Sequence, residues 1–190
     1  HRWAVILDSR AEDLARAITA DVGKPITQAR AEVARAIDHV RTAVDLVDAT
    51  RDEAVAPGVT ARTRPVGVVA LIMPWNNPLA LPVGKVAAAL VLGDAVVLKP
   101  APQGARIAET IVATLAESGV PTGLVSLAIG GADVGATLAR ADGVDVVAVT
   151  GSVETGRSIA VDCARLGRPL QAELGGNNAV VVLADADLAS

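Results

Sequence analysis

Four short segments carry residues whose chemistry is unusual for a packing role. The four are Pro74-Trp75-Asn76-Asn77-Pro78, Lys99-Pro100, Thr150-Gly151-Ser152 with Gly156, and Glu173-Leu174-Gly175-Gly176. An asparagine amide held between prolines is a preorganised donor for a developing oxyanion. Lysine can bind ribose hydroxyls or phosphate, and a glycine-serine turn at a helix start suits an anion. A partly buried glutamate, whose pKa burial raises, can act as a general base.

Each segment also has an interpretation without a ligand. The Asn76 loop could be a stiff turn whose amides bond the local backbone. Lys99 could be a solvated charge at a strand end, and Glu173 a surface acid at a turn. Ser152 could simply cap a helix after a tight turn. The spacing around Gly151 is not the G-x-G-x-x-G dinucleotide fingerprint, so no single segment assigns a function.

Strands and helices alternate through most of the chain. Strands are predicted at 66–73, 95–98, 124–129 and 144–150, with shorter candidates at 170–173 and 180–183. Helices are predicted at 82–92, around 107–115, around 134–138 and at 152–164. This alternation predicts an α/β fold, a Rossmann-like, mostly parallel sheet flanked by helices. Ligands bind beyond the carboxyl ends of such strands, where the four segments and residues 130–133 lie.

We expect one unit with three parts. Residues 1–50 form a helical segment, 51–64 a charged loop or linker, and 65–190 the α/β core. Ser9 and Glu12 have capping-box spacing at the start of a helix that Gly23 ends.

Composition excludes several classes of function. The net charge is −4 without a basic stripe, which argues against nucleic acid and acidic membrane surfaces as partners. The uncharged stretch 66–84 is long enough for a membrane span, but its prolines and asparagines argue against one. Cys163 is the only cysteine, so we expect a reducing, cytoplasmic setting and a packed apolar thiol. His1 and His39 lie too far apart to suggest a metal site.

The order and spacing of the four segments resemble the aldehyde dehydrogenase superfamily. Three further pieces of the chain are also similar to that family: Gly23-Lys24-Pro25, Arg64-Pro65-Val66-Gly67-Val68 and Asp185-Ala186-Asp187-Leu188. The resemblance covers essentially the whole chain, and it implies a coenzyme-binding portion that uses NAD or NADP. Lys85 matches a lysine that is common in the family.

The resemblance also implies individual roles. Asn76 would help form the oxyanion hole, and Glu173 would activate water as a general base. The coenzyme would be bound by Pro74, Trp75, Lys99, Gly130, Gly151, Ser152, Gly156, Leu174 and Gly175. The substrate would be a small aldehyde or semialdehyde, and the full-length protein would be a homo-oligomer.

The family reaction needs a thiolate that this sequence does not place. The thiolate attacks the aldehyde, hydride leaves to the nicotinamide, and the resulting thioester is hydrolysed to a carboxylic acid. In the family that cysteine follows the Glu-Leu-Gly-Gly motif by a few dozen residues, whereas the chain ends at Ser190. We therefore expect the catalytic domain to be absent here. The alternative is a truncated, catalytically silent nucleotide-binding protein. An α/β domain without a nucleotide site would show no change in melting temperature with NAD or NADP.

Some positions depart from the family pattern. Members of the family that prefer NAD often carry glutamate where this chain has Pro102. NADP is therefore more plausible than it would be with glutamate, and the choice between NAD and NADP stays open. Asn77 and Val149 stand where Phe is usual, Asn177 replaces a frequent Lys, and Ala179 a frequent Pro. Asn77 is next to the expected oxyanion donor and could alter substrate preference. Glu173 argues against CoA-acylating and glutamyl-phosphate reductase relatives, which commonly lack that base.

Overall fold

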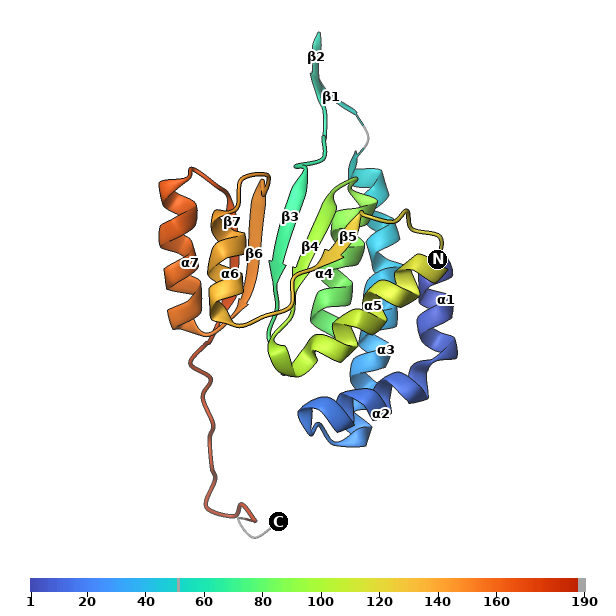
Figure 1. The fold of residues 1–190 in the computed structure, drawn as a ribbon, viewed down its shortest axis with the longest axis vertical. Helices are drawn as coiled ribbons and strands as arrows, with labels where there is room; N and C mark the ends of the chain where they lie inside the picture. The colour runs from blue at the N-terminus through green and yellow to red at the C-terminus, as the bar shows by residue number, and fades with distance from the viewer. Residues whose placement is uncertain (51, 188–190) are drawn as a thin grey trace.

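The computed structural model describes residues 1–50 and 52–187, and its centre is a parallel sheet (Figure 1). The sheet has five strands in the order β5-β4-β3-β6-β7, and each neighbouring pair is parallel. The strands are β3 (Val68–Ile72), β4 (Ala95–Lys99), β5 (Val125–Leu127), β6 (Val146–Gly151) and β7 (Leu170–Leu174). This arrangement confirms the predicted fold class.

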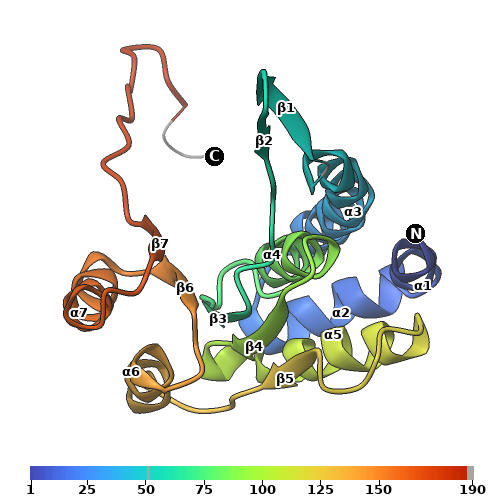
Figure 2. The ribbon, with the colours of Figure 1, turned by 90° about the horizontal axis from the view of Figure 1, so that it is seen from above.

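Helices cover both faces of the sheet because its central strand is apolar on both sides (Figure 2). Val69 and Leu71 of β3 pack in one hydrophobic cluster, and Ala70 and Ile72 in the other. The first cluster includes α4 (Ala80–Val91) and α5 (Ala105–Glu117). The second includes α6 (Ala132–Arg140) and α7 (Val153–Arg165). A single turn of 3-10 helix, η2 (Pro102–Gly104), precedes α5.

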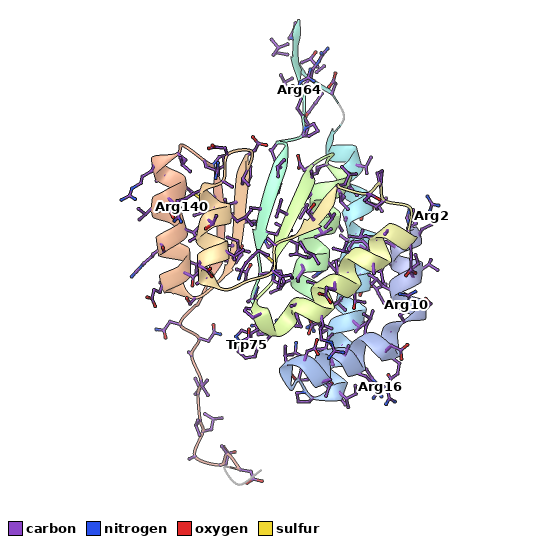
Figure 3. All side chains as sticks on the ribbon, in the orientation of Figure 1. Arg2, Arg10, Arg16, Arg64, Trp75 and Arg140 are labelled. Atoms are coloured by element: carbon purple, nitrogen blue, oxygen red, sulfur yellow. The ribbon has the colours of Figure 1, made fainter. Side chains whose placement is uncertain are left out.

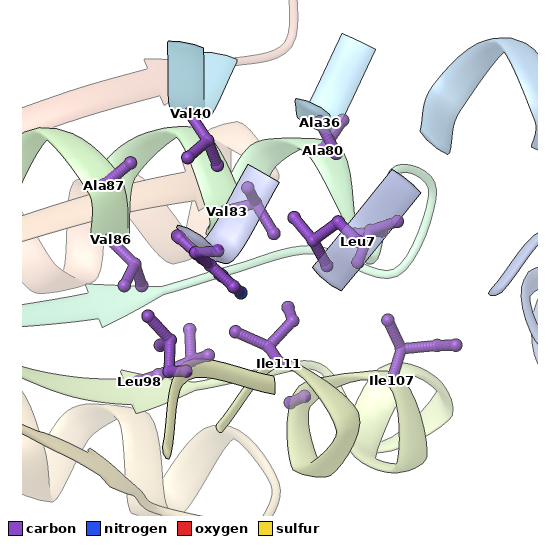
Figure 4. Close-up of a cluster of buried hydrophobic side chains, with 14 of the residues drawn as sticks. Leu7, Ala36, Val40, Ala80, Val83, Val86, Ala87, Leu98, Ile107 and Ile111 are labelled. Carbon is purple, nitrogen blue, oxygen red and sulfur yellow. The ribbon is translucent and has the colours of Figure 1, made fainter. Parts of the chain in front are cut away.

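The N-terminal helices add a layer outside α4 and α5. They are α1 (Arg2–Ser9), α2 (Ala11–Val22), α3 (Ile26–Ala43) and the 3-10 helix η1 (Val44–Thr50). Figure 4 shows Leu7 of α1, Val40 of α3, Val83 of α4 and Ile111 of α5 in one core. None of the helices in the described part of the chain is long and apolar enough to cross a bilayer.

Two carboxylates fix the start of the central strand. Gly67 N donates to Asp94 Oδ1 at 2.9 Å, and Val68 N donates to Asp145 Oδ2 at 2.8 Å. Asp94 precedes β4 and Asp145 precedes β6, so each carboxylate ties β3 to a neighbouring strand. A Cβ on Gly67 would lie 2.2 Å from Asp145 Oδ2, and the φ of 115° there also favours glycine.

The capping box predicted at Ser9 and Glu12 is wrong. Ser9 ends α1 and donates its hydroxyl to the carbonyl of Ile6 at 2.8 Å, so it is not available to cap α2. Glu12 instead pairs with Arg16 and Arg30. The other predicted signal holds, because Gly23 ends α2 in a left-handed conformation.

Two predictions about extended segments also need correction. The expected linker 51–64 contains an antiparallel hairpin of β1 (Glu53–Ala56) and β2 (Val59–Ala61), joined through Pro57-Gly58. Both strands are exposed on both faces, so their sequence has no alternation of apolar and polar residues that would predict them. The candidate strand at 180–183 is not a strand, because no described strand pairs with its backbone. Arg51 and Leu188 lie outside the described residues.

Removing the Asp94 carboxylate should weaken the sheet. Asp94→Ala leaves the part-buried N–H of Gly67 without its acceptor, and we expect a loss of about 1–3 kcal/mol in the free energy of unfolding. Urea denaturation measures this. Asp142→Ala, at an exposed position, should change it by less than about 0.5 kcal/mol. Equal losses in the two variants would contradict this role for Asp94.

Candidate functional site

A cleft of ≈ 870 Å³ lies at the carboxyl ends of the strands. Its lining includes Pro74, Trp75, Asn76, Lys99, Gly151, Ser152, Glu173, Leu174 and Gly175, which are all the predicted site residues except Gly130 and Gly156. Figure 3 shows Trp75 at the lower edge of the sheet, where the strands end. The fold therefore brings together segments that are about 100 residues apart in the sequence.

Lys99 is a buried cation at the base of this cleft. Only 5% of the residue is exposed although it ends a strand, so most of its side chain is packed within the protein. Burial lowers the pKa of its ammonium group, and the nearby charge of Asp133 partly opposes that shift. No acceptor in the described residues takes a hydrogen bond from the ammonium. A ligand with ribose hydroxyls or phosphate would supply acceptors.

The start of α7 forms one wall of the cleft. Ser152 is the N-cap of this helix, and its Oγ accepts a hydrogen bond from Thr155 N at 3.1 Å. The same hydroxyl is 2.9 Å from Thr155 Oγ1. The serine cap is therefore present, while the helix start also faces the cleft. A Cβ on Gly151 would meet nothing within 4 Å, which leaves space for an anion near the positive end of the helix.

The Asn76 loop begins where β3 ends. Met73 N donates to the carbonyl of Lys99 at 2.9 Å, which fixes the loop at its start. Asn76 is exposed, and its amide makes no hydrogen bond to any described residue. Asn77 differs, because its Oδ1 accepts a hydrogen bond from Lys24 Nζ at 2.9 Å. The Asn76 amide is thus free to donate to a ligand.

Gly130 and Gly156 do not line the cleft, and both allow close packing instead. A Cβ on Gly156 would lie 2.3 Å from Leu174 Cδ2, so this glycine lets α7 approach the end of β7. A Cβ on Gly130 would lie 2.2 Å from Val134 Cγ2. The structure gives these two glycines a packing role, and a coenzyme contact at either one stays a prediction.

Glu173 is more exposed than we expected. It lies near the end of β7, an edge strand whose residues 171–174 are all exposed. Lys85 of α4 approaches this strand and donates to Gln171 Oε1 at 2.9 Å. Burial lowers the pKa of Lys85, and the negative charge of Glu173 opposes that shift. The Glu173 carboxylate and the Lys85 ammonium therefore lie near each other in the site.

A second, mostly apolar cavity of ≈ 600 Å³ adjoins the cleft, and sequence reasoning missed it. Its lining comprises His39, Thr42, Ala43, Leu46, Ala80, Leu81, Gly84, Lys85, Ala88, Thr150 and Glu173. Thr150 and Glu173 also line the cleft, so the two spaces meet at these residues. Small residues at Ala80, Gly84 and Ala88 recur every fourth position of α4 and leave a groove. That spacing is visible in the sequence.

Glu32 was also missed, although it is the most deeply buried charge near the site. It is 0% exposed, and its Oε1 accepts hydrogen bonds from Leu79 N at 2.9 Å and Ala80 N at 3.1 Å. Its other oxygen pairs with Lys24. Its position within the apolar stripe of α3, between Ala29 and Ala36, was a signal that it is buried.

Cys163 is packed in the core, as predicted. It is 1% exposed, in a cluster with Val147 and Ile159. Burial raises the pKa of its thiol, which disfavours the thiolate that a nucleophile requires.

The sheet order and the cleft define a Rossmann-like α/β protein. The model of the aldehyde dehydrogenase family matches residues 1–190, and the chain belongs to that family. It is 39% identical to alpha-ketoglutaric semialdehyde dehydrogenase of Bacillus subtilis, over 99% of this chain and 40% of that protein. It is 40% identical to geranial dehydrogenase of Castellaniella defragrans, over 98% of this chain and 40% of that protein.

A solved structure shows the same similarity. Aldehyde dehydrogenase C of Pseudomonas syringae, a mutant in complex with NAD+ and octanal, matches with a TM-score of 0.90 and 36% identity. The match covers 98% of this chain and 39% of that one. The chain therefore spans about 40% of the length of these relatives.

The two glycines of the α7 turn should respond differently to alanine. Gly156→Ala forces a methyl group against Leu174, and we expect a loss of about 1–3 kcal/mol in the free energy of unfolding. Gly151→Ala should leave stability nearly unchanged but weaken NAD+ or NADP+ binding in a fluorescence titration, because the methyl group enters the cleft. Unchanged stability in Gly156→Ala would refute the packing role.

Proposed function

We propose that this chain supplies the coenzyme cleft, the oxyanion donor and the general base for NAD(P)-dependent oxidation of an aldehyde to a carboxylic acid. One observation carries the proposal. Thr150 and Glu173 line both the polar cleft and the apolar cavity. A coenzyme in the first space and an aldehyde in the second would meet beside a carboxylate.

The cleft suits a dinucleotide in shape and in charge. Lys99 offers a cation without an acceptor among the described residues, and the α7 start offers backbone N–H groups next to the open space at Gly151. When bound, NAD(P) would supply the hydride acceptor. Pro102 lines the cleft where a carboxylate would repel the 2′-phosphate of NADP, so this chain has no such barrier at that position.

Asn76 and Glu173 would act on the aldehyde and on water. The free amide of Asn76 would donate to the carbonyl oxygen as negative charge develops there. Glu173 would take a proton from the water that hydrolyses the thioester. In this proposal the nucleophilic thiol comes from residues outside 1–190, because Cys163 is buried with a raised pKa.

The apolar cavity favours a substrate with a hydrocarbon chain. Its walls on α4 are formed by Ala80, Leu81, Gly84 and Ala88, which present little polar surface. The geranial dehydrogenase and the octanal complex among the relatives fit this chemistry. Lys85, which lines the cavity, would also suit the carboxylate of a semialdehyde, and the Bacillus relative is named for a semialdehyde.

A second candidate is a catalytically silent nucleotide-binding protein. The observation that favours it is the single cysteine, which is packed in the core. That candidate predicts coenzyme binding without turnover, so an assay with an aldehyde and either coenzyme separates the two.

The proposal predicts distinct defects for two variants of the polypeptide that carries residues 1–190. Asn76→Ala should lower kcat for aldehyde oxidation by about 10²–10³-fold and leave coenzyme affinity unchanged. Glu173→Gln should keep a single-turnover burst of reduced coenzyme but lose about 10²–10⁴-fold in steady-state turnover. Absorbance of the reduced coenzyme in stopped-flow mixing measures both.

The matched control is Glu109→Gln, at an exposed glutamate on α5. It should keep both the burst and the steady-state rate. Steady-state turnover of Glu173→Gln at the unmodified rate would remove Glu173 from the mechanism. Coenzyme binding without any turnover of the unmodified polypeptide would favour the silent candidate.

A further inference from the structure

Asn77 connects the Asn76 loop to a buried ion pair that the proposed chemistry does not use. Its side-chain oxygen accepts a hydrogen bond from Lys24 Nζ at 2.9 Å, and a longer one from Arg35 Nη2 at 3.4 Å. Lys24 lies in the turn after α2, and its ammonium is paired with the carboxylate of Glu32 on α3. The loop is thus tied to two helices that do not line the cleft.

Glu32 holds the other end of the same loop. Its Oε1 accepts hydrogen bonds from Leu79 N at 2.9 Å and Ala80 N at 3.1 Å, which are orphan N–H groups at the start of α4. A fully buried carboxylate needs such partners, and Lys24 with these two N–H groups supplies them. The carboxylate therefore fixes the backbone directly after Pro78.

The geometry leaves Asn76 between two anchored points. On one side, β3 ends with Met73 bonded to Lys99. On the other side, Lys24 holds the Asn77 side chain and Glu32 holds the backbone of Leu79 and Ala80. The Asn76 amide between these two points has no hydrogen-bond partner among the described residues. Catalytic groups must be held within about 0.5 Å of the productive geometry, so anchoring the neighbours of an oxyanion donor affects the rate.

We propose that Lys24, Glu32 and Asn77 are positioning residues that aim the Asn76 amide. The inference rests on the proposed oxyanion role of Asn76. It also concerns a feature particular to this chain, because Phe, which is usual after the family's asparagine, could not accept a hydrogen bond from Lys24.

The test is a double-mutant cycle on kcat with Asn76→Ala and Asn77→Ala, in the polypeptide that carries residues 1–190. Asn77→Ala should lower kcat by about 10- to 100-fold with coenzyme affinity unchanged. In the double variant the two losses should not multiply, because Asn77 acts only through Asn76. Asn77→Asp keeps an acceptor for Lys24 and should restore most of kcat. A purely structural role would give none of this pattern.

Amide hydrogen exchange gives a readout that does not depend on turnover. In Asn77→Ala and in Glu32→Gln, exchange of the amides at 75–80 should accelerate by about tenfold or more, because the loop opens locally. Arg30→Ala, which removes an exposed ion pair between α2 and α3, is the matched control and should leave those amides unchanged. Should Glu32→Gln not fold, Asn77→Ala still carries the test.

The outcomes separate this inference from the proposed function. A loss of kcat in Asn76→Ala with a normal rate and normal exchange in Asn77→Ala would overturn the positioning role alone. A normal rate in Asn76→Ala would overturn the oxyanion role, and with it the purpose of the anchors. Losses that multiply in the double variant would also overturn the inference.

Discussion

Parallel pairing on both sides of β3 is the constraint on which the site depends. Because β4 and β6 both run parallel to β3, the chain leaves all three strands at the same edge of the sheet. Lys99, the Asn76 loop and the start of α7 therefore converge there. The carboxylates of Asp94 and Asp145 bond to the backbone at the start of β3. They therefore help to align β3 with β4 and β6 at the end of the strands that lies away from the site.

The electrostatics of the site follow from how each charge is buried. Lys99 is inside the protein without an acceptor among the described residues, so it can gain interactions when an anionic or hydroxylated ligand enters. Glu32 is buried further, but its bonding capacity is used by Lys24 and two backbone N–H groups. One buried charge is thus available for binding, and the other holds structure in place.

Sequence patterns predicted those elements that depend on interactions between residues close together in the chain. The apolar runs at 66–73, 95–98, 124–129 and 144–150 and the glycine at the end of α2 predicted elements that the structure confirms, whereas the apolar run at 180–183 did not. Ser9 shows the limit, because its spacing to Glu12 fits a cap but the preceding residues are already helical. The hairpin at 53–61 has no apolar face, so periodicity did not predict it.

The site itself was predictable only in part. Nine of the eleven predicted site residues line one cleft. That Thr150 and Glu173 line both the cleft and the apolar cavity was not predicted, because it depends on how the helices pack on the sheet. The packing of Gly156 against Leu174 was not predicted, while its contact with the coenzyme stays a prediction. The hydrogen bond from Lys24 to Asn77 joins residues 53 positions apart, and no local sequence pattern predicts it.

The central claim is that the coenzyme lies in the cleft with its reactive end beside Thr150 and Glu173, facing the apolar cavity. A crystal structure of the polypeptide with NAD+ or NADP+ bound tests it most directly. The account predicts the adenosine ribose at Lys99, the pyrophosphate at Gly151 and Ser152, and the nicotinamide next to Glu173. A coenzyme bound outside this cleft, or with its nicotinamide at Lys99 and its adenine at Glu173, would contradict the account.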